Sequence, residues 1–174
     1  IMGPNGPRFM HRIELQMIFP TGKYDENKAL NPGSNFFSFN PYWAGTLFIT
    51  PKWTATTRIH YLLNADNNDP NPALNANDTR AGQAIHLNFA TAYEILPKRL
   101  RLGVNGYYLK QVNDTQKNGV DIPDSKEQVF GIGPGAVYHF SKDVHLFVNA
   151  YFESMAENRP EGERVNVRLV YHFW

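Results

Sequence analysis

The chain has no cysteine among its 174 residues, almost no net charge and no long hydrophobic run. Without cysteine, a disulfide scaffold and a metal site with thiolate ligands are excluded. A net charge of +1 gives no reason to expect nucleic acid or a strongly anionic partner. No stretch approaches the roughly 20 consecutive apolar residues that a membrane-spanning helix needs. If this chain crosses a bilayer, it must therefore cross with strands.

Aromatic residues, by contrast, make up 14% of the chain and occur in segments that alternate apolar and polar side chains. The clearest example runs to the C-terminus. Its apolar row is Val165, Val167, Leu169, Tyr171 and Phe173, and its polar row is Arg164, Asn166, Arg168 and His172. Because successive strand residues point to opposite faces, one face suits lipid and the other suits water. Such a strand resembles the terminal segment of bacterial outer-membrane β-barrels, although Trp174 extends one residue beyond the usual aromatic end.

About eight segments with this two-residue period are expected as strands. They cover residues 8–19, 35–49, 53–63, 83–95, 99–111, 127–140, 144–154 and 164–174. No segment keeps a helical period. The sequence therefore predicts an all-β protein, an antiparallel transmembrane β-barrel that forms a single domain over residues 1–174. Strands of this length exceed the roughly 9 to 11 residues that cross the hydrocarbon at a tilt.

The connections between the expected strands alternate in length. Residues 50–52, 96–98 and 141–143 make tight turns, whereas residues 20–34, 64–82, 112–126 and 155–163 are long and rich in Asn, Asp, Gly and Pro. Outer-membrane barrels have short periplasmic turns and longer external loops. This alternation favours a membrane barrel over a soluble sandwich, and it predicts a periplasmic C-terminus.

Five stretches, at residues 20–25, 31–39, 103–108, 131–135 and 158–162, occur in an order and spacing that carry a family resemblance. Together they resemble the bacterial outer-membrane proteins grouped as the phenol-degradation meta-pathway family. The resemblance implies a Gram-negative outer membrane and uptake of aromatic or other hydrophobic compounds, and it supplies no catalytic residues. Family members look longer, and no secretory signal is visible from Ile1 onward. We therefore expect the C-terminal portion of a larger barrel, of about twelve strands, as an alternative to eight.

Ten polar residues fall on the water-facing side of the expected strands and are candidates for lining a lumen. They are Arg12, Glu14, Arg58, His60, His86, Glu94, Arg101, His145, Glu153 and Arg168. An arginine facing lipid at mid-bilayer would cost roughly 2 to 4 kcal/mol, so this placement is consistent with a membrane barrel. We expect the arginines, Arg164 included, to pair with the glutamates, and the histidines to be scattered. No cofactor, metal or catalytic residue is expected.

Two motifs have competing interpretations. The glycine-rich stretch at residues 131–135 is similar to a phosphate loop, but such a loop joins a strand to a helix. Here the two-residue period continues, so we expect Gly131, Gly133 and Gly135 to permit a bend or the close approach of another element, and Pro134 to mark a bulge. The acidic stretch at residues 66–78 has enough oxygen ligands for calcium but lacks the EF-hand pattern, so a solvated loop is favoured.

The leading functional hypothesis is a porin-like pore or transporter for small, aromatic or hydrophobic compounds, which contacts outer-membrane lipid and no nucleic acid. One alternative is a structural or assembly subunit that joins partner subunits in a membrane complex. An outer-membrane hydrolase is weaker, because serine is scarce and no Ser/His pair is fixed by spacing. A soluble lipocalin-like barrel is a further alternative. If eight strands close alone, Tyr107, Phe147 and Tyr151 would fill the interior.

Overall fold

The chain folds into long antiparallel strands, seen in a computed structural model that describes residues 1–3 and 6–173. The long strands are β3 (Phe9–Glu14), β6 (Tyr42–Phe48), β7 (Trp53–Asn64), β9 (Ala84–Leu96), β10 (Leu100–Gln111), β13 (Gln128–His139), β14 (Val144–Glu157) and β15 (Glu163–Tyr171). The short ones are β1 (Met2–Gly3), β2 (Gly6–Pro7), β4 (Met17–Ile18), β5 (Ser38–Phe39), β8 (Thr79–Arg80), β11 (Gln116–Lys117) and β12 (Val120–Asp121). A single turn of 3-10 helix, η1, covers Pro72–Leu74. The predicted all-β class is confirmed.

The main sheet is antiparallel and has ten strands. Its long strands pair in chain order, from β3 through β6, β7, β9, β10, β13 and β14 to β15. Two of the expected strands are each divided, the first into β3 and β4 and the second into β5 and β6. Pro41 lies at the second division, and proline cannot donate a ladder hydrogen bond. The ten strands thus follow the segments that the alternating pattern marks, although β7, β9 and β15 extend one residue beyond them and β14 extends three.

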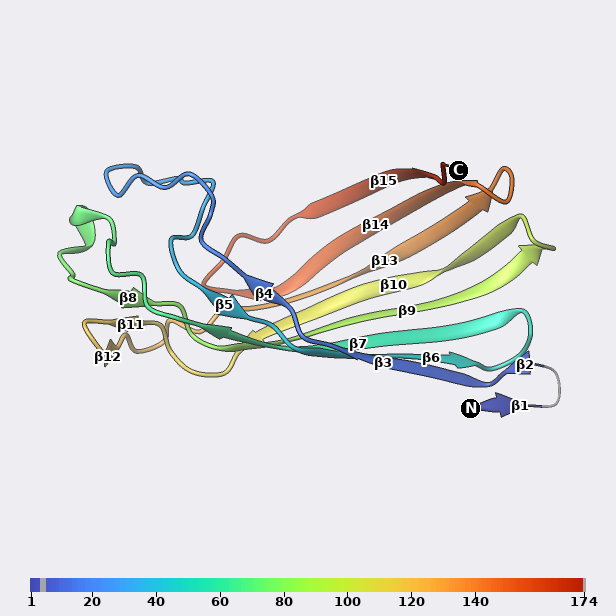
Figure 1. The fold of residues 1–174 in the computed structure, drawn as a ribbon, viewed down its shortest axis with the longest axis horizontal. Coiled ribbons are helices and arrows are strands. Elements are labelled where there is room, and N and C mark those ends of the chain that lie inside the picture. Colours follow the sequence, from blue (N-terminus) through green and yellow to red (C-terminus); the bar gives the residue numbers. More distant parts are fainter. Residues whose placement is uncertain (4–5, 174) are drawn as a thin grey trace.

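The sheet is open. Strands β3 and β15 form its two long edges, and within residues 1–3 and 6–173 they do not pair with each other (Figure 1). The closed barrel expected from the sequence is therefore absent from the described part of the chain. In the same part, no helix has the length and apolar character needed to span a membrane.

The two ends of the sheet differ as the connection lengths predict. Tight turns and both termini lie at one end, and the long connections with β8, β11 and β12 lie at the other (Figure 1). The turns are closed by hydrogen bonds such as Ile49 N to Trp53 O at 2.9 Å and Phe140 N to Val144 O at 3.0 Å. The predicted segregation of loop lengths is confirmed. Trp174, the last residue of the expected terminal strand, lies outside the described residues.

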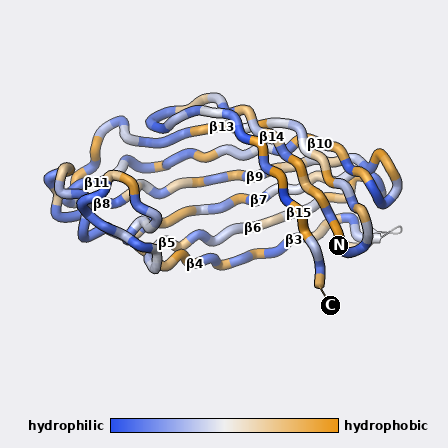
Figure 2. Tube along the Cα trace, turned by 90° about the horizontal axis from the view of Figure 1, so that it is seen from above, coloured by the Kyte–Doolittle hydropathy of each residue, from blue (hydrophilic) through white to orange (hydrophobic). Residues whose placement is uncertain are grey.

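The sheet has hardly any hydrophobic core. Among the described residues, the buried apolar side chains are Ala44, Ala84 and Val129. The large apolar residues instead lie on an exposed face, where Leu169 is 65% and Val104 is 43% accessible. Hydrophobic and hydrophilic positions alternate along each strand, and the strands follow one another around an arc (Figure 2). This apolar face is far larger than the patches that soluble monomers tolerate.

Candidate functional site

The ten candidate residues share one face of the sheet, which we call the polar face. Cross-strand partners point to the same side, so the register can be followed from β3 to β15. One row of partners is Arg12, Ala44, Arg58, Asn88, Tyr107, Gly131 and Glu153, and the next is Glu14, Tyr42, His60 and His86. A third row joins Glu94, Arg101, Val137, Phe147 and Arg168, with His145 one row further. Leu87, Phe89, Val148 and Leu169 point to the opposite side.

The polar face is the concave one. Its side chains reach across intervening strands. Arg101 Nη2 on β10 donates to Thr54 Oγ1 on β7 at 2.7 Å, above β9. The polar face is also the better covered one, since His60 is 7% and Asn105 is 8% accessible. The strands therefore curve around the polar residues and turn the apolar ones outward.

Strand β13 presents three glycines, Gly131, Gly133 and Gly135, and therefore no side chains, on part of the polar face. A Cβ atom on Gly131 would lie 2.6 Å from Cζ of Tyr107, and one on Gly135 would lie 2.2 Å from Oδ1 of Asn105. These glycines thus permit the close approach of side chains from neighbouring strands, as predicted. Because β13 continues unbroken through the stretch, the arrangement is no strand-to-helix phosphate loop.

The bulge predicted at Pro134 is wrong. Pairing between β13 and β14 has the same register before it, at Ile132 with Phe152, and after it, at Gly135 with Asn149. The irregularity lies instead between Gln128 and Phe130. Proline lacks a donor, but here the ladder passes it without an inserted residue.

The arginines do not pair with the glutamates as expected, with the exception of Arg12, which lies 2.6 Å from Glu14. Among the described residues, Arg58, Arg101, Arg164 and Arg168 have no carboxylate within ion-pair distance. Three of these guanidinium groups lie over aromatic rings. Their ring partners are Tyr42 for Arg58, Phe147 for Arg168, and both Tyr107 and Tyr151 for Arg164. Aromatic faces attract cations, so rings take the place of the expected counter-ions.

The histidines are not scattered either. His60 stacks on His86 with ring centroids 4.1 Å apart, and on Tyr42 at 4.5 Å. Toward the tight-turn end, His145 contacts His139, Nδ1 to Nδ1 at 2.8 Å, and lies 5.3 Å from the ring of His172. The pairs arise because cross-strand register places His60 opposite His86 and His139 opposite His145 on neighbouring strands. Sequence reasoning missed His139, although its place in the alternation puts it on the polar face.

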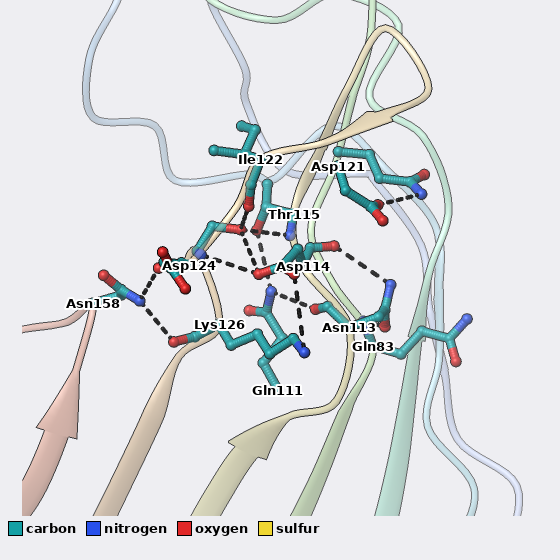
Figure 3. Close-up of polar contacts among 12 residues, drawn as sticks. Gln83, Gln111, Asn113, Asp114, Thr115, Asp121, Ile122, Asp124, Lys126 and Asn158 are labelled. Atoms are coloured by element: carbon teal, nitrogen blue, oxygen red, sulfur yellow. Dashed lines mark hydrogen bonds and ion pairs between the residues drawn. The ribbon is translucent and has the colours of Figure 1, made fainter.

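The long connections are more ordered than solvated loops. A cluster around Asp114, the Asp114 loop cluster, ties the β10–β13 connection to the loop after β14 (Figure 3). Asp114 Oδ1 accepts from the backbone N–H of Ser125 at 3.1 Å, and Asn158 Nδ2 donates to the carbonyls of Asp124 and Lys126 at 2.7 and 2.8 Å. Strands β8 and β11 also pair across two connections. The Asn and Asp content indicates loops, but nothing in it indicates these partners.

The structure places an ion pair in the acidic stretch at residues 66–78. Within the described part of the chain, no group of three or more His, Cys, Asp or Glu side chains is arranged to hold a metal ion. Asp66 is instead held by Arg80 in a two-pronged ion pair, with both N···O distances 2.7 Å. The hydrogen bond from Arg80 lowers the pKa of the Asp66 carboxyl below its usual value. Both side chains are 40% accessible, so the stretch is a solvated loop, as expected, that this pair holds in place.

Comparison with known proteins places this geometry in a family. The profile of the family described as "Putative MetA-pathway of phenol degradation" matches residues 2–169. The chain belongs to this family. The resemblance read from the sequence is thereby confirmed. No curated protein matches the chain significantly.

The fold of this family member matches a solved structure, an outer membrane channel from Pseudomonas putida F1. The TM-score is 0.86 at 19% sequence identity, over 99% of this chain and 62% of that channel. The chain thus spans less than two thirds of the length of the channel. At this identity the likeness establishes a shared fold.

Proposed function

We propose that the chain forms part of the wall of an outer-membrane channel for small solutes. The observation that carries the proposal is the division of one sheet into two faces. The ten candidate residues share the concave polar face, and large exposed hydrophobic side chains cover the other. Lipid is the medium that covers such an apolar face without a partner protein. The polar face would then line the aqueous path.

A membrane-embedded sheet needs closure, because unpaired backbone groups are very unfavourable in hydrocarbon. The edges β3 and β15 would therefore pair with further strands or with each other. We favour a barrel of about twelve strands over one of eight. In an eight-stranded barrel, Tyr107, Phe147 and Tyr151 would fill the interior and block diffusion.

The proposal is for transport and not for catalysis. The serine hydroxyls that make hydrogen bonds are used structurally. Ser38 Oγ donates to Asn64, and Ser125 Oγ donates to the carbonyl of Ile122. The family description names phenol degradation, so small aromatic compounds are the first solutes to test.

Two experiments test the proposal. Purified protein in planar bilayers should give discrete ion conductance, and the absence of any conductance would count against a channel. For location, the cysteine-free chain offers a clean background for labelling in intact cells. A membrane-impermeant maleimide should label Asn75→Cys in a long connection and leave Lys98→Cys in a tight turn unlabelled. The reverse pattern, or equal labelling, would contradict the proposed orientation.

A further inference from the structure

We propose that the polar face carries a binding site for small aromatic anions, formed by Tyr107, Tyr151, Glu153, Arg159 and Arg164. We call this group the Tyr–Arg cluster. The inference rests on the proposed channel function and specifies the class of solute that the channel selects. It is drawn from the contacts within the cluster.

The cluster brings β10 together with β14 and β15, which are not its neighbours in the sheet. Tyr107 lies on β10, Tyr151 and Glu153 on β14, and Arg164 on β15. They meet because β13 places Gly131 beneath them, where a side chain would collide with the ring of Tyr107. The two tyrosine rings lie 5.2 Å apart and tilted by 51°. They offer aromatic faces to the same space.

Both tyrosine rings face one cation. The guanidinium carbon of Arg164 lies 5.3 Å from the ring centroid of Tyr107 and 5.1 Å from that of Tyr151. The N–H groups of this guanidinium find no acceptor among the described residues, although arginine has five donors to offer. Arg164 is thus positioned by stacking and keeps its hydrogen-bonding capacity open.

A second arginine is held nearby by its loop. The loop that joins β14 to β15 is anchored at Asn158, which belongs to the Asp114 loop cluster, and at Gly162, whose N–H donates to Glu153 Oε2 at 3.0 Å. Between these anchors lies Arg159. Its Nε is buried without a hydrogen-bond partner, and its Nη1 lies 3.9 Å from Glu127. The Arg159 side chain as a whole is 29% accessible, so its other guanidinium N–H groups can meet an arriving acceptor.

The charges and free hydrogen-bond donors of the cluster determine whether its ligand is an anion or a cation. Glu153 accepts one hydrogen bond at each carboxylate oxygen, from the Tyr107 hydroxyl and from Gly162. Among the described residues, Arg164 makes no hydrogen bond, and Arg159 has only its 3.9 Å contact with Glu127. Within the cluster two guanidinium groups thus stand against one carboxylate, so an anion is favoured over a cation. The planar guanidinium group of arginine can also donate two parallel hydrogen bonds to the two oxygens of a carboxylate.

The space limits the size of the ligand. Tyr107, Glu153, Arg159 and Arg164 line a cavity of about 250 Å³. This is below the roughly 300 to 1,000 Å³ of pockets for drug-sized ligands, so a single ring fits the site. The site fits an aromatic carboxylate. The ring of such a ligand would lie against tyrosine, and its carboxylate would face the two guanidinium groups.

The test uses benzoate as the probe and measures its binding to the purified protein in detergent by calorimetry, together with conductance in planar bilayers. Benzoate should bind more tightly than benzyl alcohol, benzylamine or cyclohexanecarboxylate. Arg164→Gln and Arg159→Gln should each weaken benzoate binding about tenfold, the usual effect of losing a hydrogen bond to a charged group. Arg164→Lys keeps the charge and should lose less, which guards against misfolding of the first variant.

The matched control is Arg168→Gln, which removes the same charge from the polar face beside Phe147, outside the cavity. It should leave the benzoate affinity unchanged. Equal loss in Arg168→Gln and Arg164→Gln, or equal binding of benzyl alcohol, would overturn the site. Conductance without benzoate binding would also overturn it and leave the channel intact. Benzoate binding without conductance would support the site and overturn the channel.

Discussion

The two faces of this sheet are built from the same strands, yet their side chains are matched to different surroundings. On the polar face, residues are matched to one another across several strands, as Arg164 on β15 is to Tyr107 on β10. On the apolar face, residues such as Val104 and Leu169 stand largely exposed. The difference teaches that the polar face is held by contacts among its own side chains, such as the pair of Arg12 and Glu14. The other needs only to be apolar, because a surrounding medium covers it.

The strongest way to break this comparison is to place a charge on the apolar face. Val104→Arg should destabilise the membrane-inserted protein by about 2 to 4 kcal/mol, because the guanidinium would face hydrocarbon. The measurement is the free energy of unfolding in lipid vesicles, from urea titration. Ala90→Arg is the matched control, since Ala90 is an exposed residue on the polar face of β9. If both substitutions cost the same, the faces do not differ in their surroundings.

A second test concerns close packing on the polar face. A Cβ on Gly103 would lie 2.0 Å from the backbone oxygen of Thr91, whereas one on Gly162 would meet nothing within 4 Å. Gly103→Ala should therefore lower the free energy of unfolding by roughly 1 to 3 kcal/mol, as overpacking does. Gly162→Ala should leave it nearly unchanged in the same urea titration. A neutral Gly103→Ala would mean that β9 and β10 lie further apart than described.

A third test separates the two tyrosines of the Tyr–Arg cluster. Tyr107→Phe removes the hydroxyl that donates to Glu153 and should cost about 1 kcal/mol in the free energy of unfolding. Tyr151→Phe keeps the ring beside Arg164 and removes a hydroxyl that makes no hydrogen bond in the described structure, so its cost should be near zero. Similar losses for both would show that the hydroxyl of Tyr107 is not the feature that matters.

The smallest effect is expected outside the sheet, in the long connection fixed by Asp66 and Arg80. The folded-state pKa of Asp66 lies below its unfolded value, so the pair stabilises the loop fully above the unfolded pKa. This contribution should be lost as the pH falls through the folded pKa. The protection factors of residues 65–80, which compare hydrogen exchange with the intrinsic rate at each pH, should fall in acid, and Asp66→Asn should remove most of that pH dependence. Protection factors that stay constant across this range would contradict the role of the pair.

The sequence was a good guide wherever structure follows from local alternation. The strand segments, the two faces and the alternation of tight and long connections all come from the two-residue period and the turn residues. The ten candidate residues reach one face for the same reason. The sequence was a poor guide to partners, since Arg101 donates to Thr54 and pairs with no glutamate, and the register is unchanged across Pro134. The sequence of a single strand specifies neither its alignment with the neighbouring strands nor the curvature of the sheet.

By itself, therefore, the sequence determined which residues alternate and so which would meet water and which would meet an apolar medium. Only the tertiary structure decided which polar residues meet. Arg164 reaches Tyr107 across two strands, and His60 stacks on His86, because register sets the depth of each residue and curvature brings distant strands together. Register and curvature are properties of the whole sheet, since the contact between two side chains depends on how all the strands that separate them are aligned and bent.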